Sequence, residues 1–294
     1  TSILETKFKV HKTQGNFNNE LGVPLTILAA PEDSDILVLE MGADNFGQLD
    51  FLSKLVKPDY TIITNIGESH IEFFGSRAGI AKAKFEITNG MKKDGFFVYN
   101  GDEPLLKELV ENSSINATSC GENSYNDIIL ENYTITRDKI DFKLNIDKNS
   151  FSTTLKGKHN IFNIMFAVAI AKKIGLANEE IRHAIDNISK ITNMRLESIT
   201  YGEDSLIIND AYNASPTSMK AAVDVISDLN DFEFKTLVLG SMFELGPNEV
   251  EYHSGIGTYI NNNSRGINLV ISVGYLAKNI TDNINNKDIS TLHF

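Results

Sequence analysis

One short stretch of this 294-residue chain brings together a histidine, two carboxylates and a lysine. An apolar, β-branched run at 60–66 predicts a buried strand, and the polar turn after it carries His70 between Glu68 and Glu72. A helix is predicted next, with Lys84 in the middle of its apolar face. The pattern therefore predicts a lysine amine in an apolar stripe, close to a strand end that presents an imidazole and carboxylates.

Lys84 needs an explanation, because an unpaired buried ammonium is costly. Its charge could be paired with Glu40 or Glu72, or its methylene stem could carry the ammonium to the surface. A third interpretation is that the amine is neutral and chemically altered. For an ordinary lysine, the rarity of buried charge favours the first two interpretations.

The segments around Lys84 alternate between strands and helices. Strands are predicted at 8–10, 35–41, 60–66, 96–99 and 115–119, and helices at 46–56, 76–93 and 101–110. This alternation is the βαβ pattern of a parallel sheet that is covered on both faces. Short apolar runs between 125 and 156 predict antiparallel hairpins appended to that sheet.

A second α/β unit is predicted in the last third of the chain. We place the boundary so that a parallel-sheet domain spans 1–193 and a Rossmann-like domain spans 194–294. In the second unit a strand at 205–209 is followed by Asp210, and Ser215 with Pro216 is a plausible start of a helix. His253 has an open role, since it could equally be a surface histidine or a functional one.

Several polar side chains stand at the predicted ends of elements. Glu40 ends a strand where open α/β sheets bind ligands, although by itself it could be only a strand-end charge. Asn160 and Asn163 lie one turn apart at a helix N-terminus, where one could simply be a cap, but where anions also bind. Arg195, taken alone, is best interpreted as an exposed arginine between the domains.

The loop TQGNFNNELG, which contains Asn16 and Asn19, is rich in Asn and Gly. Its simplest interpretation is a polar turn that caps a helix starting near Asn19. The alternative is a loop that faces a substrate, because a long motif with fixed glycines is rarely accidental.

The bulk composition excludes several classes of protein. The formal net charge of -12 argues against nucleic-acid binding, which usually requires a basic surface. The single cysteine, Cys120, rules out an intramolecular disulfide and suits a reducing compartment. No apolar run approaches the roughly 20 residues that span a bilayer.

Taken together, the motifs resemble those of the Mur ligases over nearly the whole chain. The matching segments are TQGNFNNELGVPLT, EMG, NIGESHIEFFGSRAGIAKAKFEI, GKHNIFN and DAYNASPTSM. The most specific pieces are SHIEFFGSRAGIAKAKFEI and DAYNASPTSM. Two positions depart from the family pattern: Ser215 replaces the commoner asparagine, and Ser241 in GSMFELG replaces an aspartate, which puts any role of that position in doubt.

The resemblance implies a P-loop-type ATPase central domain followed by an incomplete Rossmann-like domain. It implies an ATP-dependent ligase of peptidoglycan precursor synthesis that joins D-alanyl-D-alanine to UDP-N-acetylmuramoyl-tripeptide through an acyl phosphate. It also implies ATP and Mg²⁺ as cofactors and closure of the two domains on binding. We expect a cytoplasmic monomer that neither binds nucleic acid nor inserts into a membrane.

The resemblance also assigns roles to individual residues. The metal ligands would be Glu40, His70 and Lys84, with the lysine carbamylated; Asn160, Asn163, Arg195 and Asp210 would hold the nucleotide; Asn16, Asn19, Asn213 and Ser215 would face substrates; and Lys84, His70 and Arg195 would be catalytic. Carbon dioxide adds only to an uncharged amine, and burial lowers the pKa of a lysine. The resulting carbamate is an anionic oxygen ligand, which suits a hard cation.

The family's phosphate-binding loop, of the form GxxGKT(T), does not occur in these residues. We therefore interpret the chain as a fragment that folds but binds ATP poorly and has no ligase activity. A folylpolyglutamate synthase is a rival hypothesis, which the segment DAYNASPTSM disfavours. A non-catalytic nucleotide-binding relative is another, although a degenerate protein would be expected to lose several site residues together.

Overall fold

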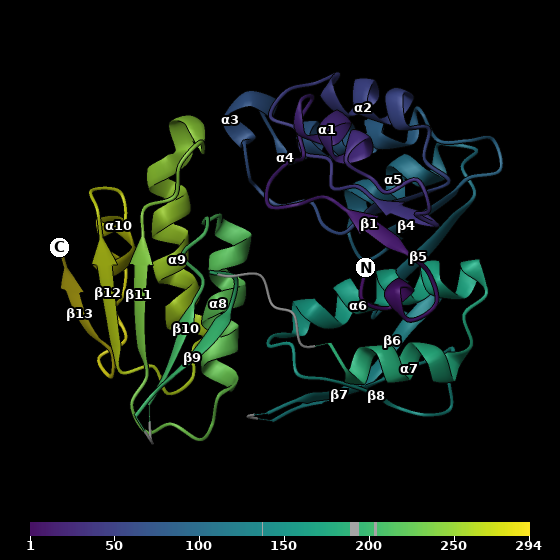
Figure 1. Cartoon of the computed structure of the whole chain (residues 1–294). Helices are drawn as coiled ribbons and strands as arrows, with labels where there is room; N and C mark the ends of the chain where they lie inside the picture. The colour runs from purple at the N-terminus through teal and green to yellow at the C-terminus, as the bar shows by residue number, and fades with distance from the viewer. Residues whose placement is uncertain (137, 189–193, 203–204) are drawn as a thin grey trace.

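The computed structural model describes residues 1–294 except 137, 189–193 and 203–204 (Figure 1). It contains two α/β units, which we call the N-terminal unit (1–188) and the C-terminal unit (194–294). This confirms the predicted fold class: a parallel sheet with appended antiparallel strands, followed by a second, Rossmann-like sheet. No helix among the described residues is long and apolar enough to cross a membrane.

The N-terminal unit begins with a small parallel sheet. Its elements are the 3-10 turn η1 (Leu4–Thr6), β1 (Val10–Lys12), α1 (Gly22–Leu28), β2 (Ile36–Val38) and α2 (Gln48–Val56). Strand β1 pairs in parallel with β2. The predicted strand at 35–41 is therefore shorter than expected, because the paired ladder covers only Ile36–Val38, and Glu40 lies just beyond it.

A six-stranded sheet forms the body of this unit. Its strands are β3 (Tyr60–Ile63), β4 (Phe96–Asn100), β5 (Ala117–Gly121), β6 (Ile128–Ile135), β7 (Ile140–Leu144) and β8 (Phe151–Thr153), in that spatial order. Pairing is parallel from β3 to β6 and antiparallel from β6 to β8. Residues 96–99 of β4 are buried on both faces, as expected for a strand covered by helices on each side.

The helices around this sheet are α3 (Ile71–Phe74), α4 (Arg77–Phe85), α5 (Pro104–Glu111), α6 (Lys158–Ile174) and α7 (Asn178–Asp186). Helix α4 starts where predicted, because the Ser76 hydroxyl accepts a hydrogen bond from the Gly79 amide at 3.0 Å. It ends at Phe85, followed by the 3-10 turn η2 (Glu86–Thr88), so the prediction of one helix to residue 93 was wrong. The reason is tertiary: the Ser53 hydroxyl of α2 donates to the Glu86 carbonyl at 3.2 Å and accepts from the Gly90 amide at 3.0 Å, so it takes the place of the helical bond between these two groups. Gly90 packs so closely there that an added Cβ would lie 2.0 Å from the Ser53 carbonyl oxygen.

The C-terminal unit contains two smaller sheets. Strands β9 (Glu197–Tyr201) and β10 (Ser205–Asn209) pair antiparallel, whereas β11 (Thr236–Gly240), β12 (Leu269–Val273) and β13 (Ser290–His293) pair in parallel. The helices are α8 (Pro216–Asp228), α9 (Glu249–Asn263) and α10 (Lys278–Asp282), and the 3-10 turn η3 (Gly246–Asn248) precedes α9. Strand β9 was not predicted from the sequence.

One hydrophobic cluster joins the two units. Ile71 and Phe74 of α3 belong to the same buried cluster as Met242 and Leu245, which lie between β11 and α9. Helix α3 also contacts η3, and Figure 1 shows α3 next to the end of α9. A separate cluster packs α6 against the six-stranded sheet. This buried apolar surface helps to hold the two units together.

Candidate functional site

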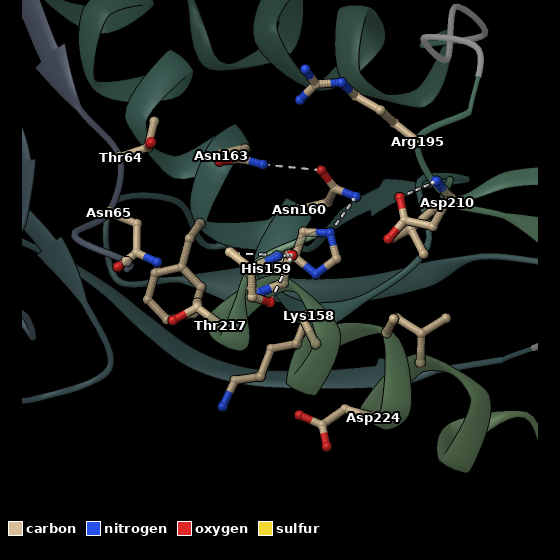
Figure 2. Close-up of a pocket in the computed structure, with 18 of the residues that line it drawn as sticks. Thr64, Asn65, Lys158, His159, Asn160, Asn163, Arg195, Asp210, Thr217 and Asp224 are labelled. Carbon is tan, nitrogen blue, oxygen red and sulfur yellow. Dashed lines mark hydrogen bonds between the residues drawn. The ribbon is translucent and has the colours of Figure 1, made fainter. Parts of the chain in front are cut away.

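A cavity of about 1080 Å³ lies between the two units (Figure 2). Its walls come from the loop after β3, from α4, from the start of α6, from the segments around Arg195 and Asp210, and from α8. The predicted site residues that line it are Lys84, Asn160, Asn163, Arg195, Asp210, Asn213 and Ser215. Glu40, His70, Asn16 and Asn19 are not among its lining residues.

The two asparagines of α6 are adjacent, as the spacing predicted. The Asn163 amide donates to Oδ1 of Asn160 at 3.1 Å, and the Asn160 amide donates to the Lys156 carbonyl at 2.7 Å. The helix starts directly after Gly157, whose φ of +87° suits a glycine. These bonds fix the side-chain amide of Asn160 on the cavity wall.

His159 is a cavity residue that sequence reasoning did not select, although it lies inside the segment GKHNIFN. Burial lowers the pKa of His159, and the charge of Asp210 opposes that shift. Figure 2 shows its ring next to Asn160, whose amide nitrogen is 3.3 Å from Nε2. The lowered pKa favours a neutral imidazole beside Asn160.

Arg195 and Asp210 come together at one end of the β9–β10 pair. The Leu196 amide donates to Oδ1 of Asp210 at 3.0 Å, and the Arg195 guanidinium lies 4.6 Å from the ring centroid of Tyr212. The Tyr212 amide in turn donates to the Met194 carbonyl at 3.2 Å. Tyr212, which sequence reasoning also missed, thus supports the arginine by a cation–π contact at the edge of the cavity.

The start of α8 follows the local prediction. Ser215 is the N-cap, and its hydroxyl accepts from the Ser218 amide at 3.3 Å. The Asn213 side chain accepts from the Ala214 amide at 2.8 Å. Both side chains are therefore used in shaping the loop where it borders the cavity.

Lys84 is half-buried on the cavity wall, in the last turn of α4. Burial lowers the pKa of Lys84, and the charge of Glu40 partly offsets this. Among the described residues, no ion pair within 4.0 Å includes Lys84. The lysine is therefore desolvated without a partner at contact distance, which favours the neutral form of its amine.

The two other predicted metal ligands make contacts within the protein. The Glu40 carboxylate accepts from the Asn18 amide at 3.0 Å, and its backbone amide donates to the Thr13 hydroxyl at 2.9 Å. His70 has a left-handed φ of +61° and pairs through Nδ1 with the Glu244 carboxylate of the C-terminal unit. In the part of the chain that the structure describes, no group of three or more His, Cys, Asp or Glu side chains could hold a metal ion.

This arrangement fits a metal only in part. A carboxylate at Glu40 and a carbamate on Lys84 would be oxygen ligands of the kind that Mg²⁺ prefers, and the lowered pKa of Lys84 favours the neutral amine that the modification requires. His70 would offer only Nε2, because Nδ1 is engaged with Glu244.

The loop with Asn16 and Asn19 follows its simpler interpretation in one respect. Oδ1 of Asn19 accepts from the amides of Leu21 at 3.2 Å and Gly22 at 2.9 Å, so it shapes the start of α1. The side chain of Asn16 is exposed. The role of this loop toward a substrate stays a prediction.

Two positions whose roles the sequence left open make hydrogen bonds within the protein. His253 is fully buried: Nε2 accepts from the Met242 amide at 2.8 Å, and Nδ1 lies 2.6 Å from the Glu249 carbonyl oxygen. The Ser241 hydroxyl accepts from the Ala277 amide at 3.2 Å, next to the start of α10. His253 is therefore not a surface histidine.

Comparison with known families assigns most of the chain. Residues 1–171 match the Mur ligase middle domain, and residues 194–293 match the Mur ligase, glutamate ligase domain. The chain is 46% identical to the UDP-N-acetylmuramoyl-tripeptide–D-alanyl-D-alanine ligase of Bacillus subtilis over 264 residues, which is 88% of this chain and 56% of that relative. It is 33% identical to the enzyme of the same name from Escherichia coli, covering 89% of this chain and 58% of that protein.

Solved structures give the same result. MurF from Acinetobacter baumannii superposes with a TM-score of 0.91 at 29% identity, covering 99% of this chain and 63% of that one. MurF ligase from Thermotoga maritima, in complex with ADP, superposes with a TM-score of 0.85 at 26% identity, covering 99% and 66%. The chain thus spans somewhat more than half the length of the curated relatives it matches.

Proposed function

This chain belongs to the Mur ligase family, and we propose that it is part of a longer ligase that joins D-alanyl-D-alanine to UDP-N-acetylmuramoyl-tripeptide at the expense of ATP. The observation that carries the proposal is the cavity between the units, where Asn160 and Asn163 face Arg195 and Asp210, with Lys84 on the wall. The curated relatives cited above carry the name of this activity.

The proposed reaction has two steps. The tripeptide carboxylate attacks the γ-phosphate of ATP to give an acyl phosphate and ADP. The amine of D-alanyl-D-alanine then attacks the acyl carbon, and phosphate leaves. Bound Mg²⁺ would neutralise the phosphate charge that otherwise opposes the first step.

The side chains of this chain would divide the work between the units. Asn160 and Asn163 would hold the nucleotide from α6. The imidazole of His159 lies beside Asn160, and its lowered pKa favours the uncharged form. Arg195, supported by Tyr212, would bind phosphate oxygens from the other side, because its planar guanidinium can bond two oxygens at once.

Metal binding is proposed for Glu40, His70 and a carbamylated Lys84, and catalysis for Lys84, His70 and Arg195. The lowered pKa of Lys84 supports the modification, since carbon dioxide adds only to the neutral amine. His70 would bind through Nε2, or would exchange Glu244 for the metal. Substrate contacts are proposed for Asn16, Asn19, Asn213 and Ser215. We further propose a cytoplasmic monomer with the domain boundary between residues 193 and 194.

The test is a ligase assay on the longer protein that contains this chain. We expect ADP release with D-alanyl-D-alanine and not with glutamate as the amine donor. Asn163→Ala should raise the KM for ATP about tenfold, because one hydrogen bond to the nucleotide is lost. The control Asn112→Ala, at an exposed helix end that does not line the cavity, should leave this KM unchanged. Turnover with glutamate alone would refute the assignment, and robust ATP turnover by residues 1–294 would refute our prediction that this chain alone is inactive.

A further inference from the structure

The first turn of α8 is completed by an acid from the other unit. This 13-residue helix has no acidic residue in its own first turn, and the Ser215 hydroxyl accepts from the Ser218 amide. Oε2 of Glu68, from the loop after β3, accepts from the Thr217 amide at 3.1 Å and from the Thr217 hydroxyl at 2.7 Å. A carboxylate at this position also interacts favourably with the positive end of the helix dipole.

Glu68 has one charged neighbour in its own unit. Only 13% of its side chain is exposed, and Oε1 lies 4.0 Å from Nε of Arg77. Nη2 of Arg77 donates to the Glu103 carboxylate at 2.6 Å and to the Ile66 carbonyl at 2.8 Å. Arg77, which is itself hydrogen-bonded to the loop after β3, thus lies beside the Glu68 carboxylate.

The contact lies where both units border the cavity. Gly67 and Thr217 are both lining residues, and a Cβ added to Gly67 would be 3.7 Å from the Thr217 side chain. The loop that carries Asn213 leads directly into α8, whereas Lys84 belongs to the opposite unit. The Glu68–Thr217 contact therefore links these two walls.

We propose that Glu68 is a positioning residue that holds the two units in the closed arrangement by acting as the first-turn acid of α8. This inference rests on the proposed function, in which an acyl phosphate made on the N-terminal unit must meet an amine bound near Asn213. A displaced α8 would separate the two reactants, because a nucleophile has to approach to about 3–3.5 Å.

Two other hydrogen-bonded contacts between the units engage a different segment. The Glu72 amide donates to the Glu244 carbonyl at 3.2 Å, and His70 pairs with the Glu244 carboxylate. Both hold the turn before η3 and neither reaches α8. Glu72 is exposed, and its bond to Glu244 uses the backbone amide, which alanine retains. Glu72→Ala is therefore a matched control close to Glu68 in the chain.

The test measures the distance between the units in this chain by paired spin labels at Glu32→Cys and Lys287→Cys. Both positions are exposed, with one in each unit. Cys120 is buried and burial raises the pKa of its thiol to about 12, so it should not take up label. Far-UV circular dichroism verifies that each variant is folded.

We expect Glu68→Ala to increase the open population about tenfold, which corresponds to about 1.4 kcal/mol, and Glu72→Ala to leave it unchanged. Thr217→Val should give a smaller increase, because the Thr217 amide can still donate to Glu68, and Thr217→Ser should match the unaltered chain. Adding Thr217→Val to Glu68→Ala should open the units no further, since both changes remove the same contact.

Equal distance distributions for Glu68→Ala and Glu72→Ala would overturn the proposal, and so would additive effects in the double variant. The measurement requires neither ATP nor amide-bond formation. Its failure would therefore leave the ligase assignment standing, and a failed ligase assay would leave the distance result standing.

Discussion

Arg77→Met is expected to destabilise the protein by about 2–3 kcal/mol. Nη2 of Arg77 makes a short bond to Glu103, whose side chain is only 7% exposed, and a second bond to the Ile66 carbonyl. A hydrogen bond to a charged group contributes about 1.5–3 kcal/mol, and removing one partner of a buried pair costs about 3–5 kcal/mol. We expect a loss at the boundary between these two ranges and not above it, because Arg77 itself is 44% exposed and water weakens the interaction.

The assay is urea unfolding followed by far-UV circular dichroism, with Arg265→Met as the matched control. Nη2 of Arg265 bonds Asp228 at the same 2.6 Å, but its side chain is 74% exposed and that of Asp228 is 30% exposed. The control should therefore cost about 0–1 kcal/mol. Equal losses of unfolding free energy in the two variants would show that burial of Glu103 does not set the strength of its pair, and would refute the reasoning.

Three further predictions concern other positions. Gly90→Ala should destabilise the protein by about 3 kcal/mol or more in urea unfolding, because the new Cβ would lie 2.0 Å from the Ser53 carbonyl oxygen. The lowered pKa of Lys84 means that the unfolded state binds the extra proton, so unfolding free energy should rise with pH between that lowered value and 10.5. Lys84→Met should remove this part of the rise, and a slope identical to that of the unaltered chain would contradict it. The Cys120 thiol, with its pKa raised to about 12, should react with a thiol reagent at pH 8 only after unfolding, and rapid native labelling would disprove its burial.

Features set by neighbours in the chain could be predicted from the sequence. Ser215 followed by Pro216 marked the start of α8, and the structure has the N-cap at Ser215. The spacing of Asn160 and Asn163 placed both amides on one side of a helix, where they are hydrogen-bonded. Capping and helical periodicity depend on residues within one turn of each other, so the amino-acid order alone determines them.

Contacts between distant segments were decided only by the tertiary structure. Glu68 reaches Thr217 across 149 residues, and His70 reaches Glu244 across 174. Beyond the end of α4 at Phe85, the Ser53 hydroxyl of another helix takes the place of the helical bond from Gly90 to Glu86. No local pattern records which loops two packed units bring together, because that depends on how their apolar surfaces fit. For the same reason the sequence left three interpretations of Lys84 open, and only the structure shows that burial outweighs the charge of Glu40 in setting its pKa.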